Sequence, residues 1–88
     1  MSKYKFGDIV LIKWRDSTHM DGWQTSRSVT NMDMITCKTV GMFHSQDKMM
    51  FKVCPTVADN EDVLCPVAIP QGCIIKITRL RGSNATRF

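Results

Sequence analysis

The residues best suited to ligand chemistry surround a polar segment that follows the first apolar run of the chain. Trp14 and Trp23 flank this segment, and Arg15, Asp16 and Ser17 directly follow the first tryptophan. Aromatic rings stack on bases, contributing roughly 1–3 kcal/mol for each stacked base. An arginine can pair with a phosphate, and a carboxylate and a hydroxyl can orient a sugar or a base edge. This combination favours a loop that binds a nucleotide-type small molecule.

Two further residues complete the candidate ligand-binding site. Arg27 ends the same polar segment and offers a second partner for phosphate, and Gly41 would let the backbone approach a ligand. A purely structural role is the alternative. In that case Trp14 would end a core strand, Trp23 would fold back over the core, and the Asp-Ser pair between them would form a local turn. The sequence leaves both interpretations open.

Catalytic residue types occur in the same segment, but their arrangement argues against catalysis. Ser17, His19 and an aspartate at 16 or 21 are the types found in a hydrolytic triad. Triads are gathered from separate rigid elements, whereas these residues are neighbours in one loop. Glu61 is the only glutamate, and no phosphate-binding glycine loop is present. We therefore expect a binding protein that is not an enzyme.

Metal-ligating residue types are present but widely spaced. The cysteines stand at 37, 54, 65 and 73, so that no two are closer than eight residues, and the two histidines are isolated. Zinc sites normally use close pairs such as C-x2-C or H-x3-H. We therefore expect no metal site and no cofactor, and we interpret Cys37, Cys54 and Cys73 as small buried residues on strands.

The composition describes one small domain. Of its 88 residues 43% are hydrophobic and 23% are charged. So short a chain buries little surface, and we expect its free energy of unfolding to be modest. Self-association into a homo-oligomer is a natural supplement, and the methionines at 49 and 50 could supply the contact face. The net charge of +4 is scattered without a basic run, which ranks nucleic acid last among the partners.

No segment indicates export or a membrane. An alternating strand pattern, instead of an apolar signal region, follows Lys3 and Lys5. No stretch approaches the roughly 20 apolar residues of a membrane span. We expect a cytoplasmic protein whose cysteines remain reduced.

Apolar residues recur mainly with a period of two, which predicts strands. We expect strands at 9–14, 35–44, 49–54, 64–69 and 74–80. A long polar loop at 15–27 follows the first strand, residues 28–34 are undecided between strand and turn, and one tight turn at 70–73 precedes the last strand. This order predicts an all-β fold, a small five- to six-stranded SH3-like barrel with a long loop after its first strand. The single domain is expected to span 1–88, with an ordered core over about 6–81 and a short tail over 82–88.

The motifs resemble those of a family of small bacteriophage proteins with SH3-like barrels, mostly of unassigned function. The similarity lies in W-x-D-S at 14–17, G-W at 22–23, T-V-G at 39–41 and I-P-x-x-C-I-x-x-I-x-x-L at 69–80. It spans roughly residues 8 to 80. The methionine-rich middle and the Cys-Pro pairs at 54–55 and 65–66 depart from the family pattern, so the resemblance says least about the outer surface.

The resemblance implies a viral protein that acts in the host cytoplasm without catalysing a reaction. On that basis the leading hypothesis is a counter-defence sponge, which sequesters a nucleotide-derived immune signal at the aromatic-flanked loop. The alternative is a protein-binding module that inhibits or adapts a host or phage protein. The third hypothesis is an SH3-like barrel that binds nucleic acid.

Overall fold

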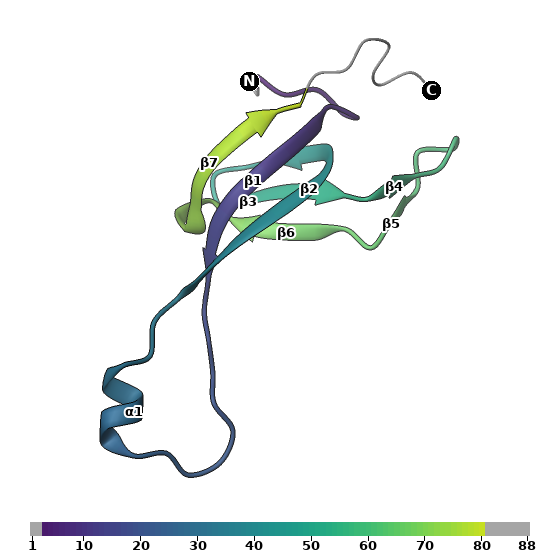
Figure 1. Ribbon diagram of the computed structural model, residues 1–88. Helices are drawn as coiled ribbons and strands as arrows, with labels where there is room; N and C mark the ends of the chain where they lie inside the picture. The colour runs from purple at the N-terminus through teal and green to yellow at the C-terminus, as the bar shows by residue number, and fades with distance from the viewer. Residues whose placement is uncertain (1–2, 81–88) are drawn as a thin grey trace.

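Five strands form one antiparallel sheet, and two short strands form a separate hairpin beside it (Figure 1). The computed structural model describes residues 3–80. The elements in chain order are β1 (Ile9–Asp16), α1 (Ser26–Thr30), β2 (Ile35–Gln46), β3 (Met50–Cys54), β4 (Thr56–Val57), β5 (Val63–Leu64), β6 (Val67–Pro70), the 3₁₀ turn η1 (Gln71–Cys73) and β7 (Ile74–Arg79). The all-β prediction is therefore confirmed.

The strand order of the large sheet is β6-β3-β2-β1-β7, so the last strand returns to pair with the first. The 3₁₀ turn η1 directly precedes β7, where the sequence predicted a tight turn. Among the described residues no ladder joins β6 to β7, and the predicted closure into a barrel is not observed. β6 has four residues, follows Pro66 and ends at Pro70. Prolines have no N–H to donate, which limits the ladders that such a strand can make.

The hydrophobic core covers the inner face of this sheet. Val10 and Ile12 of β1 are fully buried, whereas the intervening Leu11 is only partly buried, as the period of two requires. The rings of Phe43 and Phe51 pack with their centroids 5.1 Å apart. Tyr4 packs edge-on against Phe51 at 5.6 Å, so the core includes a residue that precedes the predicted ordered region. The predicted tail at 82–88 lies outside the described residues.

The connection between the first two strands differs in detail from the prediction. β1 continues to Asp16, two residues past its predicted end, and the loop gives way to α1 at Ser26. The undecided segment 28–34 contains the end of this helix and the turn after it. Thr25 caps the helix because its hydroxyl accepts a hydrogen bond of 3.1 Å from the backbone N–H of Ser28.

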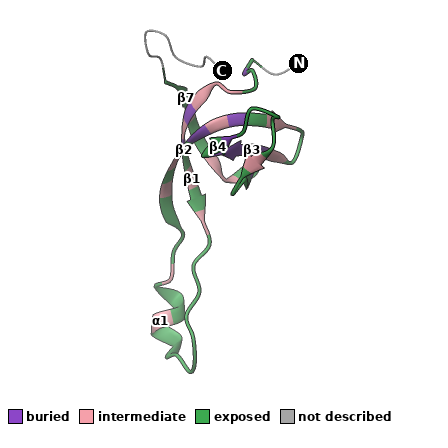
Figure 2. Ribbon diagram, turned by 90° about the vertical axis from the view of Figure 1, so that its right-hand side faces the viewer, coloured by how far each residue is buried: buried purple, intermediate pink, exposed green. Residues whose placement is uncertain are grey.

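Residues 17–34, which we call the arm, project away from the sheet beyond the paired ends of β1 and β2 (Figure 1). None of them is buried (Figure 2). The protein measures 52 × 25 × 23 Å with a radius of gyration of 16.4 Å. A compact domain of this length would have a radius of gyration of about 12 Å, so the arm makes the molecule distinctly elongated.

We expect Gly41→Val to destabilise the fold by about 1–3 kcal/mol, because a side chain there would overpack the sheet. A Cβ atom at this position would lie 3.2 Å from both the carbonyl oxygen of Cys54 and the Cβ of Val53. Gly72→Ala is the matched control, since its Cβ would meet nothing within 4 Å. Urea denaturation measures both. Equal stability of Gly41→Val and the parent would contradict this account of the packing.

We expect Asp47→Asn to remove part of the loss of stability in acid. The backbone N–H groups of Met49 and Met50 hold the pKa of the Asp47 carboxyl below its usual value, and Lys52 adds to the effect. A pKa lowered by folding stabilises the protein above the ordinary carboxyl pKa, and this contribution is lost as the pH falls through the depressed value. Urea midpoints measured at falling pH should drop less in the variant than in the parent.

The control for this measurement is Asp59→Asn, which removes a carboxylate without a hydrogen bond to any described residue. It should keep the parent's acid sensitivity. If both variants behave alike, the turn at Asp47 does not contribute to the pH dependence.

Candidate functional site

Trp14 and Gly41 belong to the packed sheet. Trp14 is half-buried against the core, and its indole Nε1 donates a hydrogen bond of 2.9 Å to the hydroxyl of Thr39. Gly41 is buried in β2, where the close backbone approach that it permits is to β3. It pairs with Val10, four residues along β1 from Trp14. Both positions therefore have a structural explanation that needs no ligand.

Arg15, Asp16 and Ser17 lie where β1 leaves the sheet. Arg15 is exposed on the outer face, and Asp16 points to the opposite face because successive strand residues alternate. The carboxylate of Asp16 accepts a hydrogen bond of 2.8 Å from the backbone N–H of the next residue, Ser17. Although these residues are adjacent in the chain, their side chains do not point toward a common site.

Trp23 and Arg27 lie on the arm, beyond the end of β1. The Trp23 side chain has a relative exposure of 103%, so it contacts almost nothing in its own chain. Arg27 is an exposed residue of α1. The seven predicted ligand-binding residues are thus divided among the sheet, the base of the arm and the arm itself.

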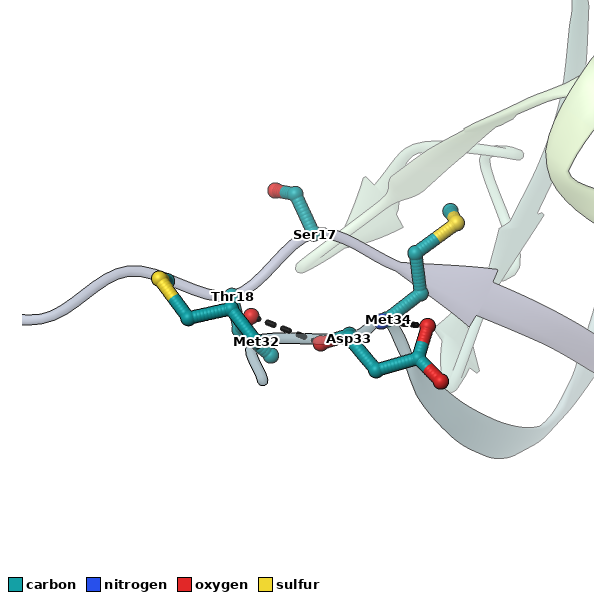
Figure 3. A pocket seen from close by; sticks show the side chains of 5 residues that line it. All are labelled: Ser17, Thr18, Met32, Asp33 and Met34. Atoms are coloured by element: carbon teal, nitrogen blue, oxygen red, sulfur yellow. Dashed lines mark hydrogen bonds between the residues drawn. The ribbon is translucent and has the colours of Figure 1, made fainter. Parts of the chain in front are cut away.

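A shallow hollow lies at the base of the arm, between its two legs (Figure 3). Its lining comprises Ser17, Thr18, Met32, Asp33 and Met34. The Thr18 hydroxyl donates a hydrogen bond of 2.8 Å to the carbonyl oxygen of Asp33, which joins the segment that leaves β1 to the segment that enters β2. The Asp33 carboxylate accepts a hydrogen bond of 2.7 Å from the N–H of Met34. These polar groups are engaged in holding the arm, and the side chains enclose no deep site.

The arm exposes several large apolar side chains besides Trp23. Met20, Val29 and Met34 have relative exposures of 48%, 55% and 46%. Its charged residues are one arginine and two aspartates, so with His19 neutral the net charge of the arm is −1. The arm therefore exposes apolar side chains that its own chain leaves uncovered, and its charges nearly balance.

The outer face of the sheet carries a cluster that the sequence analysis did not assemble. Lys13 pairs with Lys38 across β1 and β2, and with Lys76 across β1 and β7. We call these three residues the lysine row. The sequence analysis placed each lysine within a predicted strand, but the strand register that aligns the three does not follow from the pattern.

The cysteines do not form a reactive or metal-binding centre among the described residues. All four are free thiols. Cys54 is buried, as expected, and burial raises the pKa of its thiol. Cys37 and Cys73 are only half-buried, because they lie near the end of the sheet from which the arm projects, where the core thins. Within residues 3–80 no three His, Cys, Asp or Glu side chains are grouped as metal ligands, and no helix is long and apolar enough to cross a membrane.

Comparisons with known proteins provided no relative. No family model matched the chain, and neither the curated proteins nor the solved structures contained a match.

We expect the two tryptophans to respond oppositely to truncation. Trp14→Ala should destabilise the protein by roughly 2–3 kcal/mol, less than a fully buried aromatic residue would cost, and Trp23→Ala should change stability by less than about 0.5 kcal/mol. Urea unfolding measures the difference. Acrylamide quenching of each single-tryptophan variant provides the check, since strong quenching should come from Trp23. Strong protection of Trp23 in the monomer would contradict the exposed arm.

Proposed function

We propose that this chain is a non-enzymatic binding module whose arm docks onto another protein. The observation that supports the proposal best is the complete exposure of Trp23 on an arm that projects from the sheet. Tryptophan is enriched among the residues that dominate the energy of protein interfaces, because it buries a large apolar area with few rotatable bonds. An exposed tryptophan on a projecting element favours insertion into a partner's surface.

The surroundings of Trp23 support the same function. Met20, Val29 and Met34 add exposed apolar area along the arm, and methionine adapts readily to a partner's shape. Exposed large apolar side chains gathered on one projecting element favour a role in interaction. The Thr18 hydroxyl donates to the Asp33 carbonyl across the base of the arm, and the Thr25 hydroxyl accepts from the Ser28 N–H at the start of α1. Order of this kind before binding reduces the entropy lost on docking.

The arm fits a protein better than a nucleotide. Small-molecule sites normally enclose most of their ligand, whereas the two tryptophans and two arginines of the predicted site do not surround a common space. Arg27 is the arm's only lysine or arginine and is outnumbered by Asp21 and Asp33. A phosphate-bearing ligand would therefore gain little from the arm's charge. The resemblance to small phage proteins would make the partner a protein of the host or of the phage, which this module would inhibit or adapt.

The test is affinity capture from the cells in which the protein acts, with three forms of the tagged full chain. These are the parent, a Met20→Ala/Trp23→Ala arm variant, and a Met49→Ala/Leu64→Ala control whose two residues are also exposed but lie away from the arm. We expect one stoichiometric protein with the parent and the control, and its loss with the arm variant. The purified pair should then bind at least 30-fold more weakly when the arm is changed, which is a loss of about 2 kcal/mol.

Other results would redirect the assignment. Sedimentation equilibrium that shows a dimer of the parent and a monomer of the arm variant would make a second copy the occupant of the arm. A thermal shift with a cyclic or linear nucleotide that Trp23→Ala abolishes would favour the sponge hypothesis. Capture of the same partner by the arm variant would contradict docking through the arm.

A further inference from the structure

The lysine row is produced by the register of three adjacent strands. Residues directly opposite one another in an antiparallel ladder project to the same face. Lys13 of β1 is opposite both Lys38 of β2 and Lys76 of β7, and all three residues are exposed. Because neighbouring strands lie about 4.8 Å apart, the row crosses the sheet over about 10 Å at the level of the backbone.

The outward positions that flank the row in these ladders hold one arginine, two threonines and two apolar residues, but no carboxylate. One step along the ladder toward the arm, Arg15 is opposite Thr36 on the same face. One step the other way, the outward residues are Leu11, Val40 and Thr78. No lysine of the row forms an ion pair with a described residue, whereas Lys52 pairs with Asp47 at 3.8 Å and Arg79 with Asp8 at 3.2 Å.

Three opposed lysines are unfavourable for the isolated fold. Like charges directly across a ladder repel and destabilise the sheet. The ammonium groups have no access to the other face of the sheet, because the core occupies it. There Ile12 is fully buried and Ile77 packs against the core. Folding therefore concentrates positive charge on an open strand face without supplying an anion for it.

We infer that the lysine row and Arg15 bind the sugar-phosphate backbone of a nucleic acid without reading its bases. Lysine is a flexible point charge that attracts phosphate without imposing a geometry, and phosphate contacts carry no sequence information of their own. The neighbouring outward positions hold no aromatic side chain that could stack on a base. An open row suits a polymer that lies across it, whereas a small anion would need an enclosing site. This surface is separate from the arm, so the inference goes beyond the proposed protein docking.

The test is fluorescence anisotropy with a labelled DNA duplex and a single strand of unrelated sequences, over roughly 50–200 mM salt. We expect the parent to bind all sequences alike, with dissociation constants of about 10⁻⁶–10⁻⁴ M and a steep dependence on salt. The triple variant Lys13→Gln/Lys38→Gln/Lys76→Gln should bind at least tenfold more weakly at low salt. Its slope of log affinity against log salt should be shallower by about 2–3, near one for each phosphate that the variant no longer neutralises.

A charge-matched control separates the row from net charge. Lys3→Gln/Lys5→Gln/Lys48→Gln also removes three positive charges, at exposed positions outside the row. It should keep most of the parent's affinity and salt slope. The melting temperature of the row variant should equal or exceed that of the parent, because the variant loses the repulsion between the opposed lysines. Weaker binding by this variant would then not reflect unfolding.

Three results would overturn the inference. In the first, the control loses as much affinity as the row variant, so that only net charge matters. In the second, the row variant keeps the parent's affinity and salt slope. In the third, the parent binds phosphatidylserine vesicles but neither DNA form. Trp23→Ala should leave DNA binding unchanged, which keeps this test distinct from that of the arm.

Discussion

β1 is paired on both sides, over eight residue pairs with β2 and over five with β7. Because side chains alternate along a strand, this register decides, for each paired residue of the three strands, which face of the sheet its side chain occupies. Val10 and Ile12 enter the core, and Lys13 and Arg15 face outward. The packing of the core and the charge of the outer surface are therefore two consequences of the same pairing.

The β1–β2 ladder also produces the arm. The two strands remain paired as far as Asp16 and Ile35, past the region that β3 covers, and the chain between them has no core on which to fold back. A hydrogen bond from Thr18 to Asp33 across its base and the N-cap of α1 at Thr25 hold it instead. Apolar residues that would normally be buried, Trp23 above all, thus remain exposed. The ladder that carries the lysine row ends at Asp16 and Ile35, where the arm begins.

The candidate nucleotide site illustrates how proximity in sequence differs from convergence in space. Trp14, Arg15 and Asp16 are consecutive, but strand alternation sends Arg15 to the face opposite its neighbours. Trp14 is held by Thr39 and the core, and Trp23 is displaced along the arm. The strand register decides whether a tryptophan at a strand end packs inward or outward. The residue types of the adjoining loop do not reveal that register.

The sequence by itself determined the strand-rich class, the positions of four main strands, the long connection after the first of them and the tight turn before the last, because these depend on local periodicity and turn chemistry. The strand predicted at 64–69 is divided between β5 and β6, which belong to different sheets. Tertiary structure decided that the described strands do not close into a barrel and that Trp23 remains exposed. The lysine row is the clearest case. Lys13, Lys38 and Lys76 are scattered along the chain, and only the pairing of three strands aligns them on one face, since register depends on contacts between distant segments.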